Sequence, residues 1–309
     1  MAVVDDLCGG IRTLIDRYAG QYGGEQALAG VGIGTPGPLE LPAGRLHNLP
    51  NFPGWDGAPL KDEIEETLGR AVMLENDANL AALAESVLGR GKSLGVHSLC
   101  MVTLGTGIGG GIILNGRIWH GATGMGGEAG HVTVYSDGPA CGCGSNGCLE
   151  MYASATAVVR RAHELVSSGR AQGLIAKKNG HAAWTARELG EAARDGDADA
   201  QEIFNEAGRA LGIGIGGFVN MLNLPLYVVG GGLVASWDLL SPELFRELRH
   251  RSYVYRLTER GAVASGAIPG GGTQVLPAEL GSDAGLLGAC ILPFPAETTA
   301  PLEDKQAWD

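Results

Sequence analysis

One segment of the chain concentrates side chains that could bind a metal. It has a glutamate at each end, Glu128 and Glu150, and holds one histidine and three cysteines within 23 residues. The possible ligands follow the spacing H-x9-C-x-C-x4-C and are His131, Cys141, Cys143 and Cys148. One imidazole and three thiolates form a complete tetrahedral set for structural zinc, and the glycines between them let the loop fold back so that the sulfur atoms converge. This pattern predicts a zinc site that fixes both glutamates on rigid loops.

The three clustered cysteines have two alternative interpretations, a disulfide or a set of buried thiols. Six cysteines in 309 residues are too few for a disulfide-stabilised scaffold. The other three, Cys8, Cys100 and Cys290, lie in apolar, periodic segments and are predicted to be core residues. The histidine at a compatible spacing favours zinc.

A second candidate for chemistry is Asn76-Asp77, where a predicted strand ends and a predicted helix begins. The carboxyl ends of strands are where α/β folds collect ligands. Asp77 is either the N-cap of the helix, the commonest role of aspartate at such a boundary, or a catalytic base. As a base it would accept a proton from a substrate hydroxyl, as in phosphoryl transfer to alcohols.

Three glycine motifs resemble nucleotide-binding signatures but lack the structural context of those signatures. Residues 105–110 have the spacing G-x-G-x-x-G, yet a predicted strand follows them where a dinucleotide-binding turn would open a helix. Residues 212–217 have the same spacing inside a helical pattern. Gly91-Lys92-Ser93 resembles the end of a phosphate-binding loop, but the position that needs the first glycine is Ser86.

The glycine hairpin at residues 105–111 can still bind phosphate, because a turn without side chains exposes successive backbone N–H groups to an anion. The alternative is a tight β-turn that needs positive φ. Residues 230–232 are three glycines after a predicted strand, and they similarly let a flat ring approach the backbone. Two such glycine edges suggest a nucleotide held between them.

These motifs lie on strands and helices that alternate along the chain. Apolar residues at steps of three and four predict helices at residues 3–18, 58–68, 153–168, 185–194, 197–221 and 282–292, and another beginning at residue 77. Short apolar runs bounded by turn residues predict strands at 28–34, 71–74, 99–105, 111–116, 226–230 and 274–277. This alternation predicts an α/β fold with largely covered sheets.

Composition limits the class of protein. A length of 309 residues suggests about two domains, and 45% hydrophobic residues suffice for their cores. The formal net charge of −12 argues against a nucleic-acid partner. No apolar run approaches the ~20 residues of a membrane span and no signal peptide is recognised, so a cytoplasmic protein without a membrane partner is expected.

Together the motifs resemble the ROK family of repressors, uncharacterised reading frames and sugar kinases, within the actin-like superfamily. The resemblance covers essentially all of residues 1–292, with bacterial glucokinases the most similar members. It is carried by L-E-N-D-A-N (74–79), G-T-G-I-G-G-G (105–111), G-E-A-G-H (127–131), C-G-C-G-S-N-G-C-L-E (141–150) and V-V-G-G-G (228–232). It implies an α/β, two-domain, actin-like (ribonuclease H-like) sugar kinase fold with a central cleft. Residues 1–80 with 282–309 would form the smaller domain, and 81–281 the larger.

The resemblance also implies roles for individual residues in ATP-dependent phosphorylation of a hexose, with glucose at O6 as the expected reaction. Asp77 would be the general base. The residues that would bind the sugar are Asn76, Glu128, His131, Glu150 and Asn51. Those that would bind ATP are Gly105, Thr106, Gly107, Gly109 and Gly110 at the phosphates and Gly231 and Gly232 at the adenosine, with Mg2+ bridging the phosphates. His131 would bind the structural Zn2+ through one nitrogen while the other faces the sugar.

The start of the chain departs from the family pattern. Members begin with a strand carrying D-x-G-G-T, whose aspartate helps hold Mg2+, whereas residues 6–10 have one residue too many and helical spacing. Residues 1–20 match the helix that normally follows three strands, so the chain is expected to lack about 30–40 residues of that unit. A misassigned start codon or a genuine truncation would explain this departure. If the given chain is the complete protein, phosphoryl transfer is expected to be weak, although sugar binding could survive.

Two other functions are compatible with the resemblance. One is a sugar-responsive transcriptional regulator, which would carry a helix-turn-helix domain that this sequence does not show and for which its acidic charge is unsuited. The other is a catalytically impaired sugar-binding remnant. Among kinases, N-acetylmannosamine, N-acetylglucosamine, fructose and allose are alternative substrates, and a homodimer or tetramer is expected.

Overall fold

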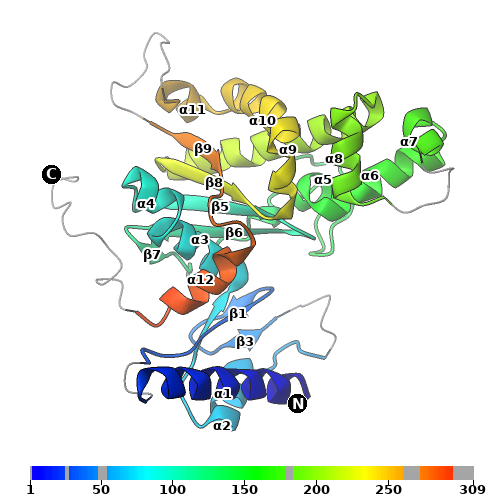
Figure 1. Cartoon of the computed structure of the whole chain (residues 1–309). Helices are drawn as coiled ribbons and strands as arrows, with labels where there is room; N and C mark the ends of the chain where they lie inside the picture. Colours follow the sequence, from blue (N-terminus) through cyan, green and yellow to red (C-terminus); the bar gives the residue numbers. More distant parts are fainter. Residues whose placement is uncertain (1, 25–27, 48–53, 178–183, 261–271, 295–309) are drawn as a thin grey trace.

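Two layers of α/β structure share one chain, with helices between and around their sheets (Figure 1). The computed structural model describes residues 2–24, 28–47, 54–177, 184–260 and 272–294. These residues form a two-stranded parallel sheet, a two-stranded antiparallel ribbon and a five-stranded mixed sheet. No helix within these ranges is long and apolar enough to cross a membrane.

The smaller layer is built from the first third of the chain. Its elements are α1 (Ala2–Tyr22), β1 (Gly32–Thr35), β2 (Leu39–Glu40), β3 (Arg45–Leu46), α2 (Leu60–Leu68) and β4 (Met73–Asn76). β1 pairs with β4 in parallel, and among the described residues no strand pairs with the other edge of β1. Val4 and Cys8 of α1 are buried with Leu60 and Ile64 of α2, because residues four apart lie on one helix face.

The larger layer is a sheet with the strand order β7-β6-β5-β8-β9. The strands are β5 (Leu99–Leu104), β6 (Ile108–Leu114), β7 (Arg117–Ile118), β8 (Leu226–Gly230) and β9 (Gln274–Pro277). β5 pairs antiparallel with β6 and parallel with β8, and β8 pairs parallel with β9. Helices cover both faces, so the central strands are apolar on both sides.

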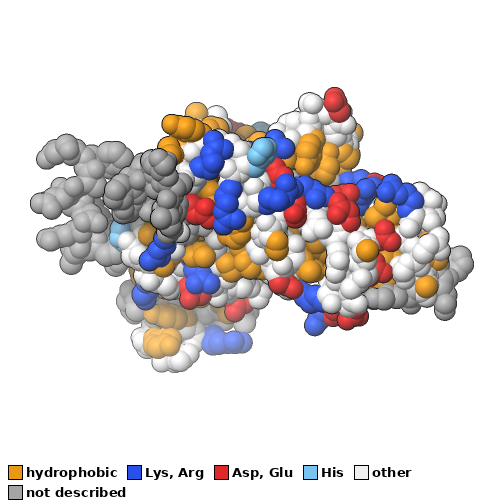
Figure 2. Space-filling view, turned by 90° about the horizontal axis from the view of Figure 1, so that it is seen from above, with side chains coloured by type: hydrophobic (Ala, Val, Ile, Leu, Met, Phe, Trp, Pro, Cys, Tyr) orange, Lys and Arg blue, Asp and Glu red, His pale blue; other side chains and the backbone are white. Residues whose placement is uncertain are grey.

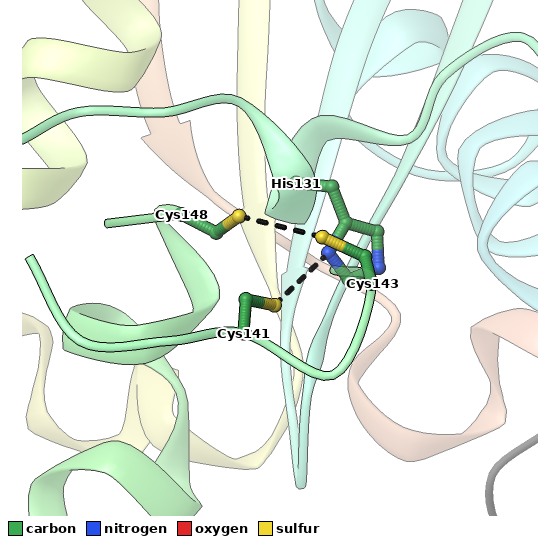
Figure 3. A group of neighbouring side chains, drawn as sticks. All are labelled: His131, Cys141, Cys143 and Cys148. Atoms are coloured by element: carbon green, nitrogen blue, oxygen red, sulfur yellow. Dashed lines mark hydrogen bonds between the residues drawn. The ribbon is translucent and has the colours of Figure 1, made fainter. Parts of the chain in front are cut away.

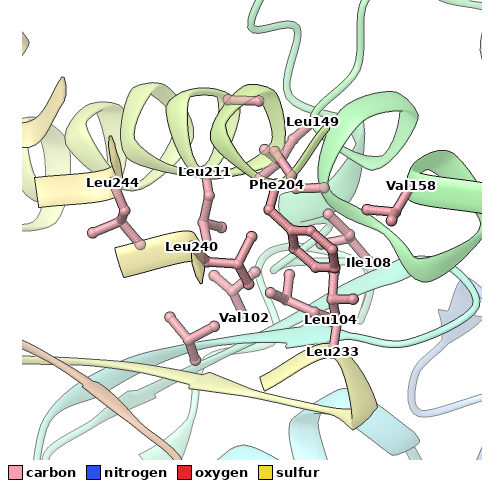
Figure 4. Close-up of a cluster of buried hydrophobic side chains, with 14 of the residues drawn as sticks. Val102, Leu104, Ile108, Leu149, Val158, Phe204, Leu211, Leu233, Leu240 and Leu244 are labelled. Atoms are coloured by element: carbon pink, nitrogen blue, oxygen red, sulfur yellow. The ribbon is translucent and has the colours of Figure 1, made fainter. Parts of the chain in front are cut away.

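Alternate side chains of β5 point into two different hydrophobic cores. Val102 and Leu104 pack into the main core, where they lie near Leu211 of α9 (Ala198–Leu222) and Leu240 of α10 (Trp237–Arg251) (Figure 4). Leu99 and Met101 point to the opposite face, which α3 (Asp77–Val87) and α12 (Ala284–Ile291) cover. The period of two in a strand therefore splits one apolar run between two helix layers.

The remaining described helices lie around the larger sheet and are α4 (Arg90–Leu94), α5 (Glu150–Ala153), α6 (Ala155–Ser167), α7 (Gln172–Lys177), α8 (Ala186–Arg194) and α11 (Tyr253–Thr258). Three short 3-10 turns complete the list: η2 (Ala129–His131), η3 (Gly232–Ser236) and η4 (Gly281–Asp283).

The glycine-rich stretch of α9 serves helix packing. A Cβ at Gly208 would lie 2.4 Å from the carbonyl oxygen of Leu240, and one at Gly212 would lie 2.6 Å from that of Leu244. These glycines let α9 and α10 approach each other closely over the main core. The prediction that residues 212–217 are helical and not a nucleotide-binding turn is confirmed.

Most predicted elements are present with shifted ends. The first predicted strand begins at residue 32 instead of 28, and the strand predicted at 71–74 runs from 73 to 76. The glycine hairpin is shorter than predicted, because β6 begins at Ile108 and includes the glycines at 109–111. Strands β2, β3 and β7 and helices α4, α5, α7, α10 and α11 were not predicted.

The face over α9 and α10 carries charges of both signs. Figure 2 views the molecule from above, and Lys and Arg side chains there are interspersed with Asp and Glu. Several pairs join neighbouring helices: Arg209 with Glu243 (3.2 Å), Arg161 with Glu206 (2.7 Å) and Arg249 with Glu259 (2.7 Å). In each pair a carboxylate locally offsets the charge of the basic side chain.

Candidate active site

Asp77 is the first residue of α3, directly after β4. The cap of this helix is Asn76, whose Oδ1 accepts hydrogen bonds from the amides of Ala78 (2.9 Å) and Asn79 (3.3 Å). The N-cap interpretation of Asp77 is therefore wrong. Burial raises the pKa of the Asp77 carboxyl, and a hydrogen bond from the Ala78 amide offsets only part of that effect. A carboxylate with a raised pKa holds a transferred proton more tightly, which suits a general base.

The glycines of β6 allow two parts of the site to pack against the same strand. A Cβ at Gly109 or Gly111 would lie 2.8 or 2.6 Å from an alanine side chain of α3. A Cβ at Gly110 would lie 2.3 Å from a backbone oxygen of the loop that precedes Glu128. Any larger residue would push the helix of Asp77 or this loop away from the strand. The glycine motif thus has a packing role that its spacing did not reveal.

Glu128 lies within electrostatic range of three other predicted site residues. Burial raises the pKa of the Glu128 carboxyl most, and His131 lowers it. The carboxylates of Asp77 and Glu150 raise it further. Charges act this clearly on one another only when they are close and poorly solvated. The structure therefore gathers these four side chains from the β4–α3 junction, η2 and α5.

A small pocket opens where these elements meet. Its lining residues are Gly37, Leu39, Asn76, Gly109, Gly110, Gly124, Met125, Gly126 and Glu128. A larger cavity, about 550 Å³, lies between the Tyr135–Pro139 segment and helices α5, α6 and α9, and its described lining contains none of the predicted sugar-binding residues. We assign the active site to the smaller pocket, because Asn76 and Glu128 line it and Asp77 directly follows Asn76.

The four predicted metal ligands lie together (Figure 3). Their donor atoms are all within 4.8 Å of one another. Cys141 Sγ is 3.6 Å from His131 Nδ1, and Cys143 Sγ is 3.6 Å from Cys148 Sγ. Tetrahedral zinc with Zn–S bonds near ~2.3 Å separates two sulfur atoms by about 3.8 Å, so the spacing fits a metal. None of the six cysteines forms a disulfide, so the disulfide interpretation is not supported. Cys8 and Cys100 are buried as predicted, but Cys290 is exposed, so the prediction that it is a core residue is wrong.

The metal-ligand loop also contacts the glycine hairpin. His131 turns Nδ1 toward the sulfur atoms and its other ring nitrogen away from them (Figure 3). Glu150 follows Cys148 by two residues, and its Oε2 accepts a hydrogen bond from the Ile108 amide at 2.8 Å. A shift of this loop would therefore move the imidazole of His131 and the hairpin together.

The predicted nucleotide-binding glycines occupy two strand ends. At the hairpin, the amides of Gly105 and Gly109 bond to Gly107 O (2.9 Å) and Thr103 Oγ1 (3.2 Å), while Thr106 is exposed at the tip. Gly231 has φ 86° and would place a Cβ 2.4 Å from Leu104 O, so only glycine fits there. Asn51, the remaining predicted sugar ligand, lies outside the described residues.

Sequence reasoning missed Glu75 and His120. Glu75 Oε2 lies 2.6 Å from His120 Nε2, and the glutamate side chain is buried. A carboxylate directly after the apolar run of the strand predicted at 71–74 was the available signal, because a buried charge needs a partner. The partner itself could not be identified from spacing, since 45 residues separate the two.

Comparison with known proteins identifies the family. The family model described as ROK family matches residues 2–294. The chain belongs to the ROK family. A glucokinase of Halalkalibacterium halodurans is 38% identical to this ROK protein over 273 residues, which cover 88% of this chain and 78% of the relative. A xylose repressor of Caldicellulosiruptor bescii is 30% identical over 230 residues, which cover 74% of this chain and 56% of the repressor.

A solved structure supports the same assignment. The ROK family glucokinase from Streptomyces griseus, in complex with glucose and AMPPNP, is 33% identical and matches this ROK protein with a TM-score of 0.71. The match covers 91% of this chain and 87% of that chain. The predicted family and the predicted actin-like α/β fold class are confirmed.

Proposed function

We propose that this ROK protein is an ATP-dependent hexose kinase that phosphorylates glucose at O6. One observation carries the proposal: Asp77, with its raised pKa, lies within electrostatic range of Glu128 beside a small pocket. The similarity to a glucokinase over 88% of the chain supports the same reaction.

Asp77 is proposed to deprotonate the O6 hydroxyl as that oxygen attacks the γ-phosphorus of ATP. The O–H proton passes to the carboxylate, the new O–P bond forms, and the bond between the γ-phosphorus and the bridging oxygen breaks to release ADP. General-base assistance of this kind contributes about 10²–10⁴-fold in rate. Most of the remaining catalysis would come from positioning and from stabilising charge on the phosphoryl group.

The sugar hydroxyls are assigned to Asn76, Glu128, His131 and Glu150. Asn76 uses Oδ1 to cap α3 and donates one Nδ2 hydrogen to Gly37 O (3.1 Å), which leaves its second hydrogen for a ligand. Glu150 uses Oε2 on the Ile108 amide, which leaves Oε1. Glu128 and the outer nitrogen of His131 would complete the set, with Asn51 as a further predicted contact.

The hairpin tip, residues 105–107, is the proposed phosphate site, supported by Gly109 and Gly110, and Gly231 with Gly232 is the proposed adenosine site. Mg2+ bound with ATP would supply positive charge that offsets the negative charge developing during transfer. We assign a structural role to Zn2+ at His131, Cys141, Cys143 and Cys148, since four protein ligands leave no position for a reactive water.

Release of ADP in a coupled assay across a panel of hexoses tests the function. Glucose, N-acetylmannosamine, N-acetylglucosamine, fructose and allose would be compared at equal concentration. We expect glucose to give the highest kcat/KM and the product to be the 6-phosphate. A preference for another hexose would change the substrate, and no hexose-dependent ADP release would reject the proposal.

The two alternative functions make different predictions. A sugar-responsive regulator is less well supported, because the match covers 56% of the xylose repressor but 78% of the glucokinase. Sequence-specific DNA binding would favour it. A sugar-binding remnant would show sugar binding without ATP binding in calorimetry. A homo-oligomer, predicted from the family resemblance, would be tested by light scattering.

A further inference from the structure

Glu75 is a buried carboxylate that lies two residues before the proposed base. It is 2% exposed, and both of its oxygens are hydrogen-bonded. Oε1 accepts hydrogen bonds from Asn79 Nδ2 (2.9 Å) and the Asn76 amide (2.8 Å), and Oε2 lies 2.6 Å from His120 Nε2. Three donors compensate the cost of burying the charge. The side chain therefore binds the start of α3 on one side and a distant loop on the other.

His120 begins the loop that ends at Glu128. It follows Trp119, which comes directly after β7, and its carbonyl oxygen accepts a hydrogen bond from the Gly126 amide at 2.9 Å. A Cβ at Gly126 would lie 2.9 Å from that carbonyl group and from the ring of Trp119. The loop is thus folded back on His120, so the position of the histidine determines where the next residues, Gly127 and Glu128, can lie.

We propose that the Glu75–His120 pair is a positioning device for the sugar site. The pair connects the strand that precedes Asp77 to the loop that carries Glu128, and it holds the proposed base and the proposed sugar ligand in register. Glu75 is a positioning residue, since it is buried and its oxygens already have partners, and His120 acts through Glu75. The inference rests on the proposed function, which assigns the base to Asp77 and a sugar contact to Glu128.

The β6 glycines explain why a separate connection is needed. They let α3 and the Glu128 loop approach the strand closely, but they supply no side chain to fix either one. A charge-assisted hydrogen bond between two side chains adds direction to this contact. The histidine side chain is 38% exposed and the glutamate 3%, so the loop end is the part that can move when the bond is lost.

Kinetics of His120→Ala and His120→Gln test the inference. We expect His120→Ala to raise the KM for glucose about tenfold or more, with a smaller change in kcat and with the KM for ATP within about twofold. His120→Gln can still donate to Glu75 and should recover most of the loss. His163→Ala, which changes an exposed histidine on α6, is the matched control and should match the wild-type protein.

A double-mutant cycle with Glu75→Gln separates positioning from general destabilisation. If the two side chains act only through each other, Glu75→Gln/His120→Ala should be little worse than the poorer single variant. Additive losses, or a glucose KM within about twofold of wild type in His120→Ala, would overturn the inference.

Hydrogen exchange provides a readout that does not depend on turnover. The amides of residues 119–128 should exchange faster in His120→Ala, while those of α9 stay unchanged. Unchanged exchange in this loop would overturn the inference even if the wild-type protein phosphorylated glucose. A wild-type protein without hexose kinase activity would reject the proposed function, and faster loop exchange in the variant would still show that the pair holds the loop.

Discussion

Asp77 and Glu128 are both partly desolvated, and the negative charge of Asp77 opposes ionisation of Glu128. Burial raises the pKa of both carboxyl groups. Asn76 caps α3, which leaves the Asp77 carboxylate available for a substrate proton. Catalysis requires an ionised Asp77, whereas ionising this desolvated carboxyl group lowers the stability of the fold.

Replacing Asp77 with Asn should lower kcat by about 10²–10⁴-fold, because the amide cannot accept the proton. Glucose affinity should stay within about tenfold of wild type, since the side chain keeps its size. The melting temperature at neutral pH should not fall, because ionising a carboxyl group with a raised pKa costs the folded state free energy that asparagine avoids. Preserved turnover would remove Asp77 from the mechanism.

The dependence of kcat/KM on pH in the acid range should report the ionisation of Asp77. Turnover requires ionised Asp77, so kcat/KM should fall as pH drops through its pKa, which lies above the ordinary value of 3.8. In Asp77→Asn the negative charge that raises the pKa of Glu128 is lost, so the titration midpoint of Glu128, followed by NMR, should move to lower pH. A midpoint that does not move would contradict the electrostatic coupling of the two groups.

At the scale of elements, the metal-ligand loop and the glycines of β6 and α9 determine how close neighbouring elements lie. The metal-ligand loop orders a stretch with little regular structure between η2 and α5, and it ties His131 and Glu150 to the glycine hairpin. Glycines in β6 and α9 let neighbouring elements approach to distances that no Cβ would allow.

Removal of zinc should loosen the sugar site. Cys143 is an exposed ligand, so Cys143→Ser should remove metal binding without leaving a core cavity. We expect a lower melting temperature and a glucose KM about tenfold higher, because the metal holds in place residues that support the sugar site. Cys290→Ser changes another exposed cysteine outside the cluster and should behave as wild type. Metal analysis that found no zinc in the wild-type protein would refute this prediction.

Gly212 and Gly217 of α9 allow a controlled test of whether glycine is needed where α9 packs against α10. Gly212→Ala should destabilise the fold by about 1–3 kcal/mol, because the new Cβ would overlap the backbone of α10. Gly217→Ala meets nothing within 4 Å and should stabilise the helix by about 0.5–1 kcal/mol. Denaturant unfolding of both variants measures the difference. Equal effects would show that close approach of α9 and α10 does not require glycine at residue 212.

At the scale of the whole molecule, the helix pair α3 and α12 lies between the smaller and the larger sheet (Figure 1). α3 joins the two, because it begins at the end of β4 and packs on β5 and β6 of the larger sheet. The division into residues 1–80 with 282–309 and residues 81–281 stays a prediction. If these parts move as units, the pocket beside Asp77 lies where they would close.

Closure of the two parts should exclude water from bound ATP. Saturating glucose is therefore expected to lower the radius of gyration in small-angle scattering. ATP hydrolysis without sugar should be slow compared with hexose phosphorylation. Glucose binding without any change in scattering, together with fast hydrolysis of ATP, would exclude this role of closure.

The amino-acid sequence by itself determined which local chemistry is possible. The metal ligands lie within 18 residues from His131 to Cys148, and Asp77 follows a strand that could be identified from its apolar run. Tertiary structure decided the rest, because it depends on contacts between distant segments. The packing role of the β6 glycines and the pairing of Glu75 with His120 join segments whose spacing carries no periodic signal. The cap at Asn76 is a local contact, but the sequence offered both Asn76 and Asp77 at this boundary. A local pattern determines a helix or a ligand set, but only the packed chain determines which of them share one pocket.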